Sequence, residues 1–235
     1  MSIYTIGDLH LSFSQDKPMD IFGNNWKNHE LKIKEDWLKK VKENDTVILP
    51  GDFSWAMHLE DTYLDFKYLN ELPGRKILLK GNHDYWWTTV TSMKKYLEKH
   101  NFNNIDFLYN NSFEIEGKAI VGTRGWSLQE SENSKKMINR ESQRLELSIN
   151  SAIKEFGMKK EIIAFMHYPP IVKPFLLDNN HLEFYKILKK YNIKKCYYGH
   201  LHGKSHLDAV TGEVGEIEFN LVSADYLDFK LIKIS

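Results

Sequence analysis

Five short polar motifs in this 235-residue chain contain the residue types that bind metal ions. In chain order they are Asp8-Leu9-His10, Gly51-Asp52, Gly81-Asn82-His83-Asp84, His167-Tyr168-Pro169-Pro170 and Gly199-His200-Leu201-His202. Their side chains offer nitrogen and oxygen donors, and the one cysteine of the chain, Cys196, lies outside them. Such donors suit Mn, Fe, Zn, Co or Ni and exclude a thiolate-rich structural zinc site.

Each of these motifs follows directly on a short apolar run that is typical of a buried strand. The predicted strands span residues 3–6, 46–49, 76–79, 162–166 and 195–198, and a sixth spans 119–121. In open α/β sheets, the ligand site lies beyond the carboxyl ends of the strands. We therefore expect the five motifs to meet at one edge of a sheet.

The number of donors indicates how many ions such a site holds. Seven is too many for one transition metal that keeps an open coordination position, but it suits two metals that share one carboxylate. The seven side chains are Asp8, His10, Asp52, Asn82, His167, His200 and His202. Each motif alone is typical of a polar turn, whereas five of them at equivalent positions favour a site. The other histidines are interpreted as structural, and they are His29, His58, His100, His181 and His206.

Helical spacing of apolar residues recurs between the predicted strands. It is found at 33–41, 59–66, 90–97 and 184–191, and the polar stretch from Glu130 to Phe156 predicts one long amphipathic helix, or two. The tail from His206 to Ser235 has strand-like runs without helical spacing, which predicts an antiparallel finish to a sheet. The alternation of strands and helices indicates an α/β fold, and a chain of this length fits a single domain over residues 1–235.

The order of the five motifs from residue 7 to residue 203 resembles that of the calcineurin-like metallophosphoesterase superfamily. Within the superfamily, the chain is similar to small bacterial predicted phosphohydrolases. The resemblance implies a two-sheet β-sandwich flanked by helices. It also implies two divalent metal ions as cofactors.

The resemblance assigns a role to each motif residue. Asp8, His10 and His202 would hold the first metal, and Asp52 would bridge it to the second. The second metal would be held by Asn82, His167 and His200. His83 would be the catalytic imidazole near the leaving group, and Asp84 would hold its far nitrogen.

The implied reaction is hydrolysis of a phosphate mono- or diester in a small phosphorylated substrate. Two adjacent cations make a shared hydroxide available at neutral pH, and this hydroxide attacks phosphorus directly. His83 would then donate a proton to the departing oxygen. Two alternatives stay open: hydrolysis of a nucleotide-linked pyrophosphate, and a non-catalytic scaffold on the same fold.

Large aromatic and basic residues follow the motifs. Trp55, Trp86, Trp87 and Trp126 either form an aromatic wall for substrate or bury the loops from behind, and burial is favoured for Trp86 and Trp87. Arg124 follows the strand at 119–121, where a guanidinium either binds a phosphate or forms a salt bridge. Arg140 and Arg144 lie four residues apart with Glu141 and Glu146 nearby, which favours a solvated helix face.

Composition limits the remaining choices. Thirty-two basic residues balance thirty-two acidic ones, so no basic excess favours long nucleic acid as a partner. The apolar runs are far shorter than the ~18 residues of a membrane span. A strand that begins at Ile3 leaves no room for a signal peptide, so we expect a cytoplasmic protein. A monomer and a dimer are equally compatible with the sequence.

Overall fold

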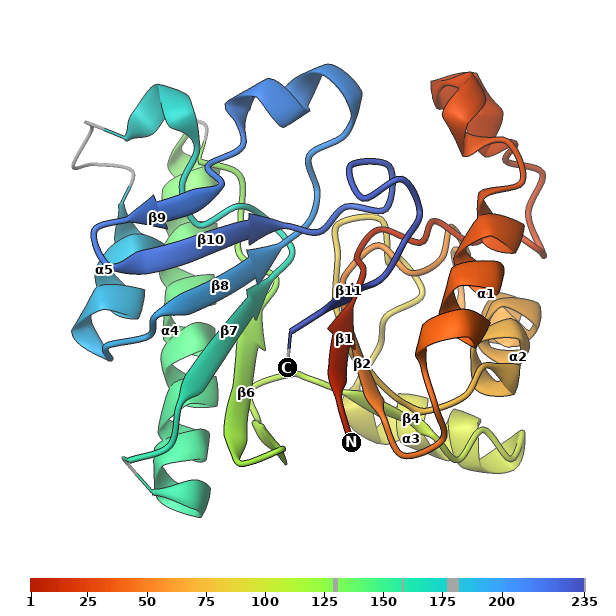
Figure 1. Cartoon of the computed structure of the whole chain (residues 1–235), viewed down its shortest axis with the longest axis horizontal. Coiled ribbons are helices and arrows are strands. Elements are labelled where there is room, and N and C mark those ends of the chain that lie inside the picture. Colours follow the sequence, from red (N-terminus) through yellow and green to blue (C-terminus); the bar gives the residue numbers. More distant parts are fainter. Residues whose placement is uncertain (129–130, 158, 177–181, 235) are drawn as a thin grey trace.

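In the computed structural model, the described residues are 1–128, 131–157, 159–176 and 182–234. They form two mixed sheets that face each other, with helices on the outer side of each sheet (Figure 1). The expectation of a two-sheet sandwich flanked by helices is therefore confirmed. Among the described helices, none combines the length and the apolar character that crossing a membrane requires.

The first sheet has five strands in the order β11-β1-β2-β3-β4. Strands β1 to β4 are parallel, and β11 pairs antiparallel with β1 at the edge. The strands are β1 (Ile3–Thr5), β2 (Thr46–Pro50), β3 (Arg75–Leu79), β4 (Ile105–Phe107) and β11 (Ile232–Lys233). The helices that belong to this half are α1 (His29–Lys40), α2 (Tyr63–Glu71) and α3 (Val90–Lys99), with 3-10 turns η1 (Met19–Phe22), η2 (Asn24–Trp26) and η3 (Leu59–Thr62).

The second sheet has six strands in the order β5-β6-β7-β8-β10-β9. Its four central strands are parallel, and β5 and β9 are antiparallel edges. The strands are β5 (Phe113–Ile115), β6 (Lys118–Thr123), β7 (Ile162–Met166), β8 (Lys195–Tyr198), β9 (Gly212–Val214) and β10 (Ile217–Leu221). The helices are α4 (Glu132–Phe156) and α5 (Glu183–Lys190), with η4 (Lys173–Phe175) and η6 (Gly203–Asp208).

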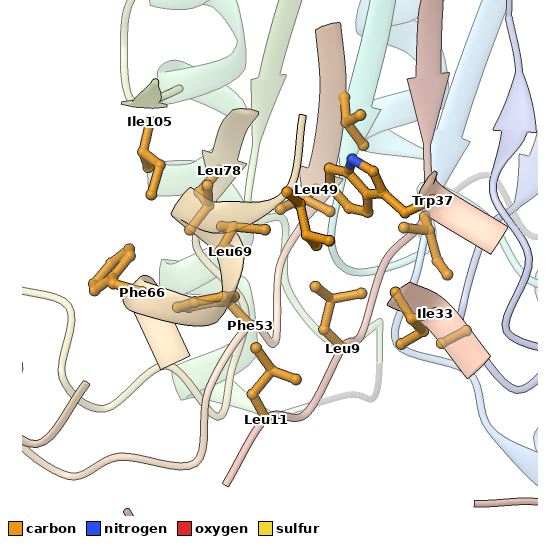
Figure 2. Close-up of a cluster of buried hydrophobic side chains, with 14 of the residues drawn as sticks. Leu9, Leu11, Ile33, Trp37, Leu49, Phe53, Phe66, Leu69, Leu78 and Ile105 are labelled. Carbon is orange, nitrogen blue, oxygen red and sulfur yellow. The ribbon is translucent and has the colours of Figure 1, made fainter. Parts of the chain in front are cut away.

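Apolar side chains fill the space between the sheets and the space beneath the helices. Between the sheets, residues of both contribute to one buried cluster, among them Ile3, Ile48, Ile77, Ile120, Ile163 and Phe165. Beneath α1 and α2, a second cluster contains Ile33, Trp37, Phe66, Leu69, Leu49 and Leu78 (Figure 2). Parallel strands buried on both faces read as continuous apolar runs, which explains why they were visible in the sequence.

All six predicted strands are confirmed, as are the helices between them. The insert after β6 is one helix of 25 residues. The antiparallel finish predicted for the tail is confirmed for β9 with β10 and for β11 with β1, but β10 runs parallel to β8, and β11 joins the other sheet. Strands β4 and β5 were missed, since three residues each are too few to show a period.

Candidate metal centre

The five motifs converge on one edge of the sandwich. They follow β1, β2 and β3 of the first sheet and β7 and β8 of the second. Contacts between distant segments mark the convergence: Nε2 of His10 lies 3.3 Å from Nε2 of His202, 192 residues away in the sequence. Likewise, Oδ1 of Asn82 lies 2.6 Å from Nε2 of His167. Both sheets therefore contribute to the same site.

The backbone at this edge adopts a conformation that side chains ordinarily avoid. Asp8, His10, Asp52 and His200 have φ angles of 57°, 46°, 50° and 73°, in the left-handed region. Such positions cost free energy and persist where the surrounding structure holds them. Here they turn the chain sharply at the strand ends, so that successive polar side chains point at the shared edge.

Two groups of potential ligand atoms lie within metal-binding reach of each other. The first contains Asp8, His10 and His202, and the second contains Asp8, Asp52 and His167. Oδ2 of Asp52 lies 3.7 Å from Nε2 of His10 and 3.6 Å from Nε2 of His167. Two carboxylates are therefore within reach of both groups: Asp8, which belongs to each, and Asp52, whose Oδ2 is close to a histidine of each.

The histidine tautomers test whether cations fit. Nδ1 of His167 lies 3.2 Å from the carbonyl oxygen of Pro50, which can only accept, so Nδ1 carries the proton and Nε2 offers a lone pair. That lone pair faces the amide Oδ1 of Asn82 at 2.6 Å, and Nδ1 of His200 faces the same oxygen at 2.8 Å. The amide oxygen is not a donor to Nε2 of His167. A cation between Nε2 of His167 and Oδ1 of Asn82 would remove the repulsion between their electron pairs, so these side chains are suited to hold a metal ion.

A further carboxylate, Asp225, orients His202 from behind. Nδ1 of His202 donates to Oδ1 of Asp225 at 2.8 Å, and the backbone N–H of Gly203 donates to Oδ2 at 3.0 Å. Nε2 of His202 is thereby left for the site, an arrangement typical of metal-bound histidine. Sequence reasoning missed Asp225. The signal was available, because Ser223-Ala224-Asp225 follows the end of β10 much as the other motifs follow their strands.

Two glycines allow the carboxylates to lie directly under the loops. A methyl group at Gly81 would overlap the carboxylate of Asp52, and one at Gly199 would overlap that of Asp8. Contacts this close exclude any side chain at these two positions. The glycines in the motifs therefore serve close approach of the backbone to the site.

Burial sets the protonation of the site. Burial raises the pKa of Asp8 to about 8, with His202 opposing the shift and Asp52 adding to it. The pKa of Asp52 is also raised, chiefly by burial. Burial lowers the pKa of His10 and of His167 well below the usual range, and that of His200 to about 2. The imidazoles of His10, His167 and His200 are therefore in the neutral form that binds metals, and bound cations would displace the carboxyl protons. Burial lowers the pKa of His202, but its hydrogen bond to Asp225 and the charge of Asp8 outweigh burial, so that pKa is raised overall.

His83 lies beside the two ligand groups. Its backbone N–H donates to Oδ1 of Asp52 at 2.8 Å, and its ring lies 4.3 Å from the ring of Trp55 between centroids. Within the described residues, Nδ1 of His83 has no hydrogen-bond partner. Burial lowers the pKa of this imidazole, with Asp52 opposing the shift.

The expectation for Asp84 requires correction, because this carboxylate does not hold the ring of His83. It accepts hydrogen bonds from backbone N–H groups of Asp52 at 3.0 Å, Phe53 at 3.0 Å and Gly81 at 2.7 Å. The indole Nε1 of Trp86 donates to it at 3.0 Å. Asp84 is fully buried, so donors from the loop after β2 and from its own loop after β3 satisfy it. Its effect is to tie the loop after β2 to the loop after β3.

Arg124 lies on the rim next to the second-sheet ligands. Nη2 of Arg124 lies 3.8 Å from Oε1 of Glu141, and the guanidinium carbon lies 4.5 Å from the centroid of the Trp126 ring. The carbonyl of Arg124 accepts from the backbone N–H of Tyr168, whose ring centroid is 4.1 Å from that of His200. The predicted salt bridge is thus present, and the guanidinium also lies over the ring of Trp126.

The solvated helix face expected for Arg140 and Arg144 fits Arg140, which is half exposed, but not the neighbouring Glu141. The side chain of Glu141 is 1% exposed, and its carboxylate accepts from Arg144 at 2.7 Å and from Thr123 at 2.7 Å. Arg140 is half exposed and lies 3.5 Å from the same carboxylate. A buried carboxylate requires such partners, and the helical period alone did not show which side of α4 faces the sheet.

Two of the four tryptophans have the environment that the sequence analysis favoured. Trp86 and Trp87 are buried behind the loops, as expected. Trp55 stacks on His10, with 4.9 Å between ring centroids and 23° between planes. His206 lies 3.3 Å from Asp225, at the back of the site, and His181 lies outside the described residues.

Comparison with known proteins places the chain in a family of metal-binding phosphoesterases. The sequence profile of the calcineurin-like phosphoesterase family matches residues 1–204, and the chain belongs to that family. Members of this family are generally hydrolases of phosphoesters that bind two metals. No protein with curated annotation matches the chain significantly.

Solved structures share the fold at low sequence identity. A protein of unknown function, AQ665 from Aquifex aeolicus, is 23% identical with a TM-score of 0.56, and the match covers 99% of this chain and 95% of that one. A phosphopantetheinyl hydrolase from Mycobacterium tuberculosis is 14% identical with a TM-score of 0.54, covering 94% and 88%. GAP50, the anchor in the inner membrane complex of Plasmodium, is 16% identical with a TM-score of 0.50, covering 95% and 71%. The same fold is therefore found in a hydrolase and in an anchor protein, so the fold alone does not distinguish these two functions, and the residues of the site must be considered.

Proposed function

We propose that this protein is a phosphoesterase that uses two divalent transition metals to hydrolyse a phosphate mono- or diester. The supporting observation is the convergence of donor side chains at the edge of both sheets, where Nε2 of His10 lies 3.3 Å from Nε2 of His202 and Oδ1 of Asn82 lies 2.6 Å from Nε2 of His167. The contact between His167 and Asn82 is costly without a cation, since neither Nε2 of His167 nor Oδ1 of Asn82 carries a proton to donate. A non-catalytic scaffold has no need to retain it.

The ligands divide into two groups that share one carboxylate. Asp8, His10 and His202 would hold the first cation, and Asn82, His167 and His200 would hold the second. Asp52, whose Oδ2 lies 3.7 Å from Nε2 of His10 and 3.6 Å from Nε2 of His167, would be the shared carboxylate that the family resemblance implies. When bound, the two cations lower the pKa of a shared water and neutralise charge on the phosphoryl oxygens.

Other residues of the chain position the loops, protonate the departing oxygen and bind the substrate. His83 donates a proton to the departing oxygen, since its ring lies 5.8 Å from the ring of His10 between centroids and lines the open cavity. Asp84 keeps the loops of Asp52 and His83 in register through its hydrogen bonds to their backbone. Arg124 binds an anionic oxygen of the substrate from the opposite rim.

The test compares metal content and turnover. Protein stripped by a chelator is reloaded with Mn²⁺, its metal is counted by mass spectrometry, and nitrophenol release is followed from bis-p-nitrophenyl phosphate and from the monoester. We expect two ions per chain and metal-dependent turnover. Asp52→Asn should lose both, because it removes the shared charge between the ligand groups.

His83→Ala separates chemistry from metal binding. It should keep two ions and lose about 10² or more in rate, the usual range for a general acid. His58→Ala, which removes an exposed imidazole outside the ligand groups, is the matched control and should change neither. Turnover of neither ester with two ions bound would point to a pyrophosphate substrate. No turnover and no bound metal would refute the proposal in favour of the scaffold.

A further inference from the structure

A cavity of about 700 Å³ opens beside the first ligand group. His10, His83 and His202 line its inner end, so it is continuous with the candidate metal centre. Its outer walls come from the segment that contains η1 and η2 and from the loops after β2 and β3. In Figure 1, the red-orange segment with η1 stands beyond the carboxyl-terminal edge of the first sheet.

The walls contain a group of large apolar side chains beside polar ones such as Gln15 and Asn25. Met19, Trp26 and Trp55 are buried in them, whereas Phe22 and Met57 at the opening are 57% and 52% exposed. Large apolar side chains that are exposed around one opening mark a surface that binds an apolar group. Methionine adapts to irregular apolar shapes, which suits a flexible ligand.

Cationic side chains are scarce in the cavity. Among the described residues that line it, Lys17 is the one Lys or Arg, and its ammonium lies 3.4 Å from the centroid of the Trp55 ring. The carboxylates of Asp16 and Asp225 also reach the lining. The cavity therefore does not present the several cations that a second, multiply charged phosphate would require.

The position of His83 decides which part of a substrate enters the cavity. The group that protonates the departing oxygen must lie beside that oxygen, and His83 lines the cavity wall. Whatever is attached to the departing oxygen must therefore extend into the cavity. A small alcohol would leave most of this space filled with water, whereas cavities of this size typically hold most of a drug-sized ligand.

We propose that the substrate is a phosphate ester whose departing alcohol carries a long or bulky apolar body, seated in the cavity between Phe22, Met57 and Trp55. This inference rests on the proposed function and adds the substrate class. A fully buried methylene group contributes about fourfold to binding. Since the outer walls are half exposed, about twofold for each methylene is expected, and four methylenes then give about tenfold or more.

The test uses butyl phosphate and octyl phosphate below their aggregation concentrations. Chain length beyond butyl hardly alters the basicity of the departing oxygen, so differences in kcat/KM report the binding of the chain. Phosphate release by the manganese-loaded protein should be about tenfold more efficient with the octyl ester. Calorimetric titration of the metal-free protein should show a preference in the same direction, independently of turnover.

Variants locate the effect. The double variant Phe22→Ala/Met57→Ala truncates two exposed side chains, which should leave the fold intact and reduce the octyl preference about fivefold. Leu147→Ala is the matched control, because Leu147 is 54% exposed on α4 and does not line the cavity, so the octyl preference should persist in this variant.

Equal kcat/KM and equal affinity for the two esters would overturn the assignment of the cavity. So would an octyl preference that the double variant retains in full. These outcomes are distinct from failure of the proposed function, which is absence of metal-dependent turnover with nitrophenyl esters. A protein that cleaves nitrophenyl esters but ignores chain length is a phosphoesterase with a different use for the cavity.

Discussion

Replacement of Asp225 by asparagine should weaken metal binding at the first ligand group without unfolding the protein. The side chain of Asp225 is 3% exposed, and its two oxygens accept from Nδ1 of His202 at 2.8 Å and from the backbone of Gly203 at 3.0 Å. Burial raises the pKa of Asp225, but the hydrogen bond and charge of His202 outweigh burial, so the pKa is lowered overall. The substitution therefore removes a full negative charge behind His202, a proposed metal ligand.

The magnitude follows from the hydrogen bonds that asparagine cannot make. Its amide has one acceptor oxygen, so either His202 or Gly203 must face an NH₂ group instead of an acceptor. Loss of a charged hydrogen bond costs about 1.5–3 kcal/mol, which corresponds to roughly 10- to 100-fold weaker binding at the first group. The second group shares no hydrogen bond with Asp225 among the contacts of the described residues, so its affinity should change little.

The assay is a titration of Mn²⁺ into chelator-stripped protein, followed by calorimetry and by metal counting after dialysis. Two-site binding should become biphasic in the variant, with one site near the wild-type affinity and one weakened. Asp228→Asn is the control, because Asp228 is 78% exposed in the same loop and pairs only with Lys230 among its ion-pair partners in the described chain. An Asp225→Asn protein that binds both ions within about twofold of the wild type would refute the role given to this carboxylate.

Two further predictions test the loops and the buried charges. Gly81→Ala should bind fewer than two ions per chain and unfold at a lower temperature, because its methyl group overlaps the carboxylate of Asp52; a variant with full metal content would contradict this. Burial raises the pKa of Asp65 to about 6, although Ser54 and Phe13 donate hydrogen bonds to it. Because the folded protein holds this proton more tightly than the unfolded chain, the contribution of Asp65 is full below about pH 4 and is lost as the pH rises through about 6. Denaturant unfolding should show Asp65→Asn gaining about 3 kcal/mol relative to the wild type between those pH values, and a pH-independent difference would refute the assignment.

The strands and the polar motifs could be predicted from the sequence because both are local. Buried parallel strands are continuous apolar runs, and Asp8, Asp52 and His167 each follow one directly. Since the carboxyl ends of parallel strands share an edge, strand order was not needed to expect convergence. The family resemblance then implied how the donors divide between two cations.

The tertiary structure decided which groups face one another. Asp84 is adjacent to His83 in the chain, yet its carboxylate accepts hydrogen bonds from the loop of Asp52, over 30 residues away. Asp225 lies 23 residues beyond His202 and reaches it because the tail returns beside β8. Such partnerships depend on which distant loops pack together, and no local period encodes them.

The burial of Glu141 and the shape of the cavity also depend on packing between distant parts of the chain. Helical spacing defines the faces of α4 but not its rotation against the sheet, which is set by packing of its apolar residues on β6. The cavity is enclosed by segments around Phe22, Met57 and His83 that are far apart in the chain. The sequence by itself thus determined the chemistry available at the edge of the sheets, and only the fold determined the partners, the protonation and the space around it.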